Sequence, residues 1–318
     1  DDAEVDLVVE CIGGTGDAAE LVERALDRGR HVVTANKDLL ATQGPRLQAL
    51  AAARGVTLRF EAAVAAAIPV VRTLDDALAG DPVAAIAGVV NGTCTSILSA
   101  MERGRDYDAA LSDARRDGFA EADPSADVDG TDAAHKLALL VQLAFRLAVI
   151  SPRIRRTGIA AIARRDVARA QMLGLRIRLV AAAIRSTHGT FAEVAPVLVR
   201  DDHEFGRTAG AENVVRVNAR DAGSLTLRGA GAGGAATASA VLGDVATVLR
   251  AIGERHDFAQ RTRASALDPA IDVSPLFESF PRTSELPQYP LWDDTSFLDA
   301  PASQAALALS WPGKERTS

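Results

Sequence analysis

The 318-residue sequence has few of the residues that mark secreted, zinc-bound or membrane-spanning proteins. It contains two cysteines, Cys11 and Cys94, which are too few for a disulfide framework, and neither falls in a His/Cys spacing typical of zinc. No window reaches about 18 uninterrupted apolar residues, and no signal peptide is visible. We therefore expect no membrane span and a reducing, cytoplasmic setting.

Aromatic residues are also scarce, at 4% of the chain, whereas apolar residues reach 48%. The core is therefore expected to consist mainly of Ala, Val and Leu, and an alanine-rich chain forms helices readily. The net charge of −7, with both signs interspersed, argues against a nucleic-acid partner. We interpret the locally basic stretch 153–165 as a solvated face rather than a phosphate-binding patch.

The most informative feature is an acidic stretch at residues 118–136. Pro124 and Gly130 mark its first part as a loop, and the pattern that follows Gly130 is helical. Asp132 and Lys136 are four residues apart, which places both on one face of the predicted helix. Five carboxylates fall within twelve residues of this stretch: Glu121, Asp123, Asp127, Asp129 and Asp132.

This stretch has two interpretations. An acid-rich loop can bind a cationic amine, and a lysine held beside a carboxylate on a rigid helix can move a proton to or from a bound molecule. Alternatively, the stretch is a solvated loop followed by a surface helix that carries one ion pair, Asp132–Lys136. Helical spacing turns His135 away from that face, so we expect His135 to pack or to lie on the surface.

The first part of the chain alternates between strand and helix patterns. Strands are predicted at 5–11, 31–34 and 56–60, with helices at 17–28 and 42–54 between them. This alternation predicts a parallel α/β sheet that amounts to half of a doubly wound fold. A full dinucleotide fold also needs a strand, a Gly-rich turn and a helix ahead of this point. We therefore expect that at least one βαβ unit is absent from the chain.

The second part predicts an α+β domain. A strand at 84–90 precedes helices that flank the acidic stretch, and four later strands are predicted at 176–184, 191–198, 214–218 and 225–227. The run Gly229–Gly234 fits the pattern Gly-x-Gly-x-x-Gly, but no βαβ unit follows it. After Gly253 the chain is proline-rich and lacks a sustained period, which indicates a loosely ordered tail.

The acidic stretch resembles, nearly letter for letter, the signature of homoserine dehydrogenases. Shorter pieces agree in the same order: Val32–Lys37, Glu61–Val64, Ile68–Arg72, Asn91–Thr93 and Gly231–Gly234. The resemblance covers residues 5 to 250. It implies NAD(P)-dependent interconversion of L-aspartate 4-semialdehyde and L-homoserine, on the route to threonine and methionine, by a homodimer.

Together these observations predict four parts. The fold class is α/β, with a partial Rossmann-like nucleotide-binding half at 1–63 and an α+β substrate and dimerisation domain at 64–228. A returning helix at 229–252 packs on the nucleotide half, and a poorly ordered tail follows at 253–318. The alternative is an inactive truncated homologue that serves only as a dimerising or binding domain.

The resemblance also implies roles for individual residues. The proton and the charge on the reacting oxygen fall to Lys136 and Lys37, and Asp132 orients that oxygen or a water. The substrate is held by Glu121, Asp127, Asp132 and Thr93. The cofactor, NADP or NAD, is bordered by Ile12, Gly13, Lys37, Gly118 and Gly233. The sequence does not decide between NAD and NADP, because the residue that discriminates them belongs to the absent half.

A monovalent cation, Na⁺, is a further implication of the resemblance, with ligands at Glu61, Val64, Ala66 and Ile68. Backbone carbonyls suit a hard cation whatever the side chain. This sequence has alanines at 65–67, where the family usually carries glycines. Alanine resists positive φ, so the loop is strained if any of the three requires it. The alternative is an alanine-rich helix N-terminus.

Overall fold

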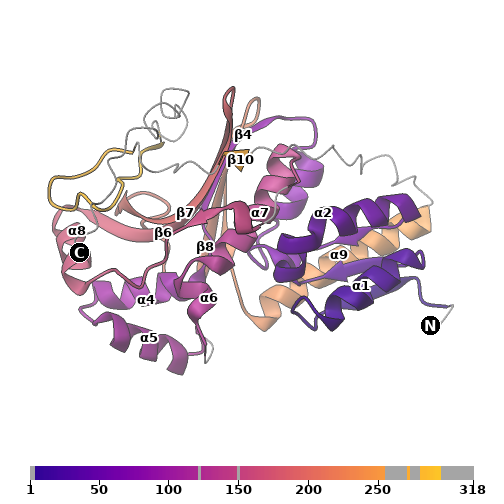
Figure 1. Ribbon diagram of the computed structural model, residues 1–318, viewed down its shortest axis with the longest axis horizontal. Helices are drawn as coiled ribbons and strands as arrows, with labels where there is room; N and C mark the ends of the chain where they lie inside the picture. Colours follow the sequence, from indigo (N-terminus) through magenta and orange to yellow (C-terminus); the bar gives the residue numbers. More distant parts are fainter. Residues whose placement is uncertain (1–3, 121–122, 149–150, 255–270, 273–279, 295–318) are drawn as a thin grey trace, which may run out of the picture.

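The computed structural model describes residues 4–120, 123–148, 151–254, 271–272 and 280–294. A small parallel sheet at the amino-terminal end has the strand order β1-β2-β3 (Figure 1). Its strands are β1 (Leu7–Glu10), β2 (His31–Thr34) and β3 (Leu58–Arg59). The connecting helices are α1 (Asp17–Asp27) and α2 (Lys37–Arg54). The alternating α/β pattern predicted from the sequence is therefore present.

Helix α2 begins five residues earlier than the predicted start at residue 42. The side chain of Asn36 accepts a hydrogen bond from the Leu39 backbone nitrogen at 3.0 Å and caps the helix. This cap is possible because Thr34 Oγ1 in turn accepts from the Asn36 nitrogen at 3.0 Å. As a result, Lys37 lies in the first helical turn, immediately beyond the carboxyl end of β2.

The larger sheet has the order β10-β7-β6-β4-β8-β9, and β5 pairs with β7. The strands along the main path pair antiparallel, apart from β10, which runs parallel to β7. Their bounds are β4 (Val83–Val89), β5 (Arg155–Arg156), β6 (Leu175–Ser186), β7 (Gly189–Arg200), β8 (Glu212–Ala219), β9 (Gly223–Ala230) and β10 (Ile271–Asp272). The predicted second, α+β part of the chain is therefore built around this sheet.

Helices cover one face of the larger sheet, and they position the acidic stretch (Figure 1). Residues on β4 alternate: Ile86 belongs to the core shared with the helices, while Ala85 and Ala87 face the opposite side. The helices on this side are α4 (Gly92–Glu102), α5 (Tyr107–Arg116), α6 (Ser125–Val128), α7 (Thr131–Phe145) and α8 (Arg164–Met172). Helix α7 ends at Phe145, where Arg146 adopts a left-handed conformation.

Residues 280–292 pack against β7, which corrects the prediction of a loosely ordered tail for this segment. Phe280 and Trp292 are buried with Phe205 on the face of the sheet opposite the helices, while Leu286 and Tyr289 join the core on the helix side. The Leu198 nitrogen of β7 donates to the Pro290 carbonyl oxygen at 2.7 Å. Aromatic burial and pairing to the edge of the strand explain the order. The rest of the predicted tail beyond residue 254 lies largely outside the described residues.

Three short elements lie between β3 and β4 and join the two sheets: η1 (Glu61–Ala63), α3 (Val70–Arg72) and η2 (Thr73–Ala77). A fourth, η3 (Ser151–Arg153), lies between α7 and β5. The long helix α9 (Gly234–Glu254) then returns to pack on β2 and η1. Its stretch Gly234–Ile252 is long and apolar enough to cross a membrane, by length and composition alone. Its contacts with the small sheet instead give it the position predicted for the returning helix.

Candidate active site

A cleft of about 510 Å³ opens between the two sheets. Its walls come from segments far apart in the sequence: the start of α2, the η1 loop, the start of α4, the acidic stretch and the glycine run before α9. The residues that carry polar groups on the wall are Lys37, Asn91, Thr93, Asp127, Asp132, Lys136 and Thr237. Much of the remaining wall is glycine and alanine, which leaves room for a flat ligand.

Asp132 and Lys136 lie on the cleft-facing side of α7, one turn apart, as their spacing predicts. Lys136 Nζ lies 2.8 Å from Asp132 Oδ2 and donates to the Val90 carbonyl oxygen at 2.7 Å. Asp132 is 8% exposed, so the ion pair is largely shielded from water. The Lys136 ammonium is therefore largely buried and is oriented by Asp132. The pair is not the exposed surface ion pair of the alternative interpretation.

Lys37 joins this pair from the other side of the cleft. Its Nζ lies 3.5 Å from Asp132 Oδ1, so one carboxylate holds two ammonium groups. Burial alone lowers the pKa of Lys37, but the carboxylates of Asp132 and Asp38 outweigh it and leave that pKa raised. Burial alone would raise the pKa of Asp132, and Lys136 and Lys37 together leave it lowered. Lys37 and Asp132 therefore both stay charged near neutral pH.

Asn91 is a site residue to which the sequence analysis gave no role beyond the family match of Asn91–Thr93. Its Nδ2 donates to Asp127 Oδ1 at 2.7 Å and to Asp132 Oδ2 at 2.8 Å. Its Oδ1 accepts from the Cys94 nitrogen at 2.8 Å, which caps α4. The helix cap thus orients one amide between two carboxylates. The separation of 41 residues between Asn91 and Asp132 explains why no local pattern indicated the contact.

Asp127 lies beside Asn91 with its carboxylate on the cleft wall. Burial, opposed by the hydrogen bond from Asn91, leaves the pKa of Asp127 raised. The buried thiol of Cys94 donates to the Asp127 carbonyl oxygen at 3.3 Å, and burial raises the pKa of Cys94 well above its ordinary value. Cys11, in contrast, is exposed. A cationic ligand group placed near Asp127 would compensate its buried charge.

The other predicted substrate and cofactor residues fall into three groups. Thr93, Gly118 and Gly233 line the cleft, and Thr93 Oγ1 donates to the Phe119 carbonyl oxygen at 2.6 Å. Ile12 and Gly13 lie off the cleft wall; their backbone nitrogens donate to Glu10 Oε1 at 2.7 and 2.9 Å. Glu121 lies outside the described residues.

The glycine run before α9 follows β9, an antiparallel strand of the larger sheet. It is therefore not the turn of a parallel βαβ unit, which agrees with the prediction of a returning segment. A Cβ at Gly231 would overlap the amide group of Asn213, and Gly233 has φ +110°. Glycine is needed at both positions, since one is closely packed and the other has a backbone that side chains disfavour.

His135 packs between α7 and α2, turned away from the Asp132–Lys136 face as predicted, and it makes a polar contact that the spacing did not indicate. Its Nδ1 lies 2.7 Å from Asp38 Oδ1, and its side chain is 17% exposed. The hydrogen bond from His135 is the largest influence that lowers the pKa of Asp38. Helix α7 packs against α2 at this point, which brings His135 next to Asp38 across 97 residues of sequence.

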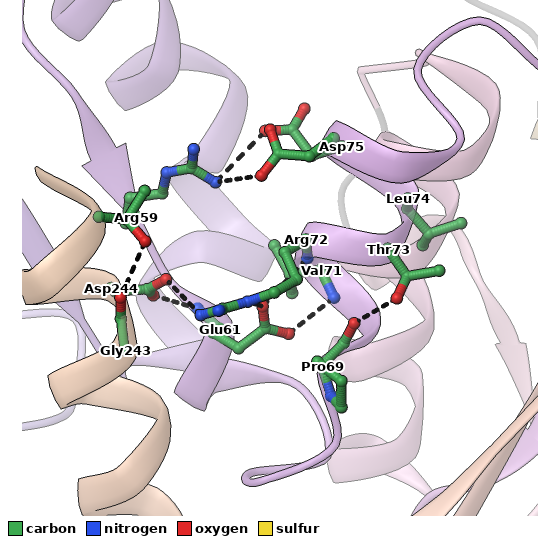
Figure 2. Close-up of polar contacts among 12 residues, drawn as sticks. Arg59, Glu61, Pro69, Val71, Arg72, Thr73, Leu74, Asp75, Gly243 and Asp244 are labelled. Atoms are coloured by element: carbon green, nitrogen blue, oxygen red, sulfur yellow. Dashed lines mark hydrogen bonds and ion pairs between the residues drawn. The ribbon is translucent and has the colours of Figure 1, made fainter. Parts of the chain in front are cut away.

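The Glu61 carboxylate forms a buried polar network (Figure 2). It accepts hydrogen bonds from the Val71 nitrogen at 2.8 Å, the Arg72 nitrogen at 3.0 Å and Arg72 Nε at 2.9 Å. Asp244 on α9 accepts from the Glu61 nitrogen at 2.7 Å. The carboxylate therefore caps α3. Glu61 would bind a cation through its backbone carbonyl oxygen. In the described part of the chain, no three His, Cys, Asp or Glu side chains are grouped to hold a metal ion.

Ala65 and Ala66 have φ values of +55° and +45°, so the loop has the strained form that the sequence analysis considered. The alternative, a helix N-terminus, is wrong, because only Glu61–Ala63 form a short 3₁₀ turn before it. A left-handed conformation costs alanine about 1–2 kcal/mol. The neighbouring contacts of this buried loop must offset that cost.

Replacing Ala65 by glycine tests this strain. Ala65 and Ala63 are both buried, at 1% and 2% exposed, but Ala63 has an ordinary φ. Both glycine variants lose a methyl group and gain unfolded-state entropy, whereas only Ala65→Gly relieves the strain. We expect Ala65→Gly to be about 1–2 kcal/mol more stable than Ala63→Gly in urea unfolding. Equal stabilities for the two variants would contradict the strained backbone.

Asp244 gives the fold a pH dependence. Burial raises its pKa from 3.8 to about 6, and its residue is 2% exposed. Between these values the unfolded chain releases the proton and the folded chain keeps it, so stability falls as pH rises from about 4 to about 6. The shift of about 2 units, at about 1.4 kcal/mol each, corresponds to about 3 kcal/mol.

Urea unfolding at pH 4.5 and pH 7 measures this contribution. The drop in stability between the two pH values should be smaller in Asp244→Asn than in the unchanged chain, because asparagine does not titrate. The variant Asp108→Asn, at an exposed position of α5, serves as the control and should keep the full drop. An undiminished drop in Asp244→Asn would rule out this assignment.

Comparison with known proteins agrees with this geometry. Residues 69–246 match the homoserine dehydrogenase family, and residues 1–61 match the homoserine dehydrogenase NAD binding domain. The homoserine dehydrogenase of Mycobacterium leprae is 47% identical over 78% of this chain, which spans 58% of that relative. A homoserine dehydrogenase from Thiobacillus denitrificans has a TM-score of 0.81 at 39% identity, over 86% of this chain and 64% of the other. A hyperthermophilic archaeal homoserine dehydrogenase in complex with NADPH has a TM-score of 0.66 at 28% identity, over 77% and 72%.

Proposed function

Because the chain belongs to the homoserine dehydrogenase family, we propose that it carries out NAD(P)-dependent interconversion of L-aspartate 4-semialdehyde and L-homoserine. The chain spans 58% of the length of its Mycobacterium leprae relative. The proposed activity therefore rests on the geometry of this chain's own residues. The observation that carries the proposal is the cluster of Lys37, Asp132 and Lys136 on the wall of the cleft.

The cleft can accept the cofactor, NADP or NAD, because much of the cleft wall is glycine and alanine. Gly118, Gly231, Gly233, Ala62 and Ala65 all line the cleft. When bound, the nicotinamide ring supplies or accepts the hydride. We assign Lys37, Gly118 and Gly233 to its border. The match of residues 1–61 to the NAD binding domain supports placing the nucleotide on the side of the cleft that these residues form.

Proton transfer is assigned to Lys136. In the direction of alcohol formation the aldehyde oxygen becomes an alkoxide and needs a proton, and an ammonium held 2.8 Å from Asp132 can donate it along a fixed direction. Lys37 then stabilises the negative charge that develops on the oxygen. This division follows from position, because Lys136 Nζ is fixed by Asp132 and the Val90 carbonyl oxygen, whereas Lys37 approaches Asp132 from α2. Asp132 keeps both ammonium groups oriented.

Substrate recognition is assigned to Asp127 and Thr93, with Glu121 as a further candidate. The α-ammonium of the amino-acid substrate would pair with the half-buried carboxylate of Asp127, which Asn91 already orients from one side. A charge pair in a partly shielded site favours the charged ligand, because leaving a partly desolvated carboxylate unpaired is costly. A semialdehyde without the amino group should therefore be a poor substrate.

A Na⁺ ion is proposed near the Glu61–Ile68 loop, bound by backbone carbonyl oxygens of Glu61, Val64, Ala66 and Ile68. Its support is the positive φ of Ala65 and Ala66, which keeps the turn although glycine is absent. The Ile68 oxygen also accepts from the Val70 nitrogen at 2.7 Å, so it would share its lone pairs.

We also propose that the chain forms a homodimer, that it is cytoplasmic, and that it divides into four parts at residues 63, 228 and 252.

The test is oxidation of NADPH, and in parallel of NADH, by the chain with L-aspartate 4-semialdehyde. We expect turnover with at least one cofactor and much weaker turnover with succinate semialdehyde, which lacks the amino group. Absence of turnover with both cofactors would overturn the proposed activity and leave the alternative, an inactive homologue that acts as a binding or dimerising domain.

A further inference from the structure

His135 and Asp38 form a polar contact that the mechanism above does not use. They lie on α7 and α2, at the same level as the Lys37–Asp132 contact. The carboxylate of Asp38 can only accept, so His135 Nδ1 must carry the hydrogen, either in the neutral imidazole or in the imidazolium. The contact is 2.7 Å long, which is typical of a hydrogen bond to a charged acceptor.

Asp38 competes with Asp132 for the same ammonium. Lys37 Nζ lies 4.0 Å from Asp38 Oδ1 and 3.5 Å from Asp132 Oδ1. Asp38 has a side chain 42% exposed, whereas that of Asp132 is 10% exposed. If Asp38 moved toward Lys37, the ammonium would be drawn out of the cleft toward water. His135 occupies Oδ1 of Asp38, the same oxygen that would make this pair.

His135 also sits between the two residues that act in the cleft. It directly precedes Lys136 and follows Asp132 by three residues on α7, while Asp38 directly follows Lys37 on α2. One hydrogen bond therefore ties the turn that carries Lys37 to the turn that carries Asp132 and Lys136. The two lysines come from different parts of the chain, so their separation depends on such a tie.

We propose that His135 and Asp38 are a positioning pair that holds Lys37 on Asp132 and away from solvent. The inference rests on the proposed function for its effect on turnover, but the contact itself is independent of it. Neither residue touches the reacting atoms. Their effect is on where the Lys37 ammonium stands when charge develops on the substrate oxygen.

Turnover of position-135 variants tests the pair. Asparagine places its Nδ2 where histidine has Nδ1, so His135→Asn keeps the donor, whereas His135→Leu removes it. We expect His135→Leu to lower kcat about tenfold, the size of one hydrogen bond to a charged group, with little change in KM. His135→Asn should stay near the unchanged chain. His188→Leu, at the exposed tip of the β6–β7 hairpin, is the control. Equal losses in the Leu and Asn variants at position 135 would overturn the proposal.

A second measurement does not require activity. The pKa of Lys37 can be followed by NMR of its side-chain carbon, assigned by its loss in Lys37→Arg. Asp38→Ala should lower that pKa, because the Asp38 carboxylate contributes to raising it. His135→Leu should change it in the opposite direction as Asp38 turns to Lys37, and His135→Asn should leave it unchanged. An unchanged Lys37 signal in His135→Leu would refute the positioning role, even if the chain shows no turnover and the proposed function fails.

Discussion

Replacing Lys136 by methionine is expected to lower kcat/KM for L-aspartate 4-semialdehyde on the order of 10³-fold. Methionine keeps most of the volume and the helical preference of lysine, but it removes the ammonium that Asp132 and the Val90 carbonyl hold toward the cleft. The alkoxide would then lack both its proton donor and one of its two cationic neighbours. Fixed-time assays at high enzyme concentration can measure activities this low.

Two comparisons sharpen this result. Arg103→Met removes a cation at the exposed end of α4 and should leave kcat/KM unchanged. Asp132→Asn should also be strongly impaired, because it releases both ammonium groups at once. If Lys136→Met retained more than a tenth of the activity, the assignment of the proton to Lys136 would be wrong.

Replacing Gly158 by alanine is expected to destabilise the fold by about 3 kcal/mol or more. A Cβ at this position would overlap the Val128 carbonyl oxygen and lie 2.6 Å from Asp129 Cα. These are backbone atoms in the turn between α6 and α7, and the turn is also bonded to its neighbour through the Ile159 nitrogen and the Val128 oxygen at 2.8 Å. The clash must therefore move the turn that presents Asp127 and Asp132.

Urea unfolding measures the loss, and substrate binding reports the displaced carboxylates through a raised KM. Gly80→Ala is a matched control, because Gly80 is exposed, has no atom within 4 Å of the added Cβ and has no positive φ. It should change stability by no more than about 0.5 kcal/mol. A Gly158→Ala variant that is as stable as Gly80→Ala would show that the turn can yield without cost.

Local signals predicted much of the fold, because they depend on neighbouring residues. The alternation of strands and helices identified the small parallel sheet, and the i,i+4 spacing placed Asp132 and Lys136 on one face. The family inferred from the acidic stretch and the α/β class inferred from the alternation are confirmed by the comparisons. The start of α2 was missed because the cap of Asn36 depends on a side-chain contact with Thr34 as well as on its own residue type.

The contacts that complete the site are long-range, and no spacing encodes them. Asn91 reaches Asp132 and His135 reaches Asp38 only after the sheet and helices have packed. The order of residues 280–292 likewise depends on burial of Phe280 and Trp292 against the sheet, while the local composition of proline and polar residues indicated a loose tail. Helical spacing indicated which side the His135 ring faces, but it could not indicate that Asp38 lies there.

The two cysteines differ in burial, so they differ in reactivity toward thiol reagents. Alkylating reagents attack thiolates, and Cys94 is enclosed beneath the acidic stretch with a raised pKa, whereas Cys11 is exposed at the end of β1. A maleimide dye would therefore attach at Cys11, next to the small sheet, and leave Cys94 unmodified.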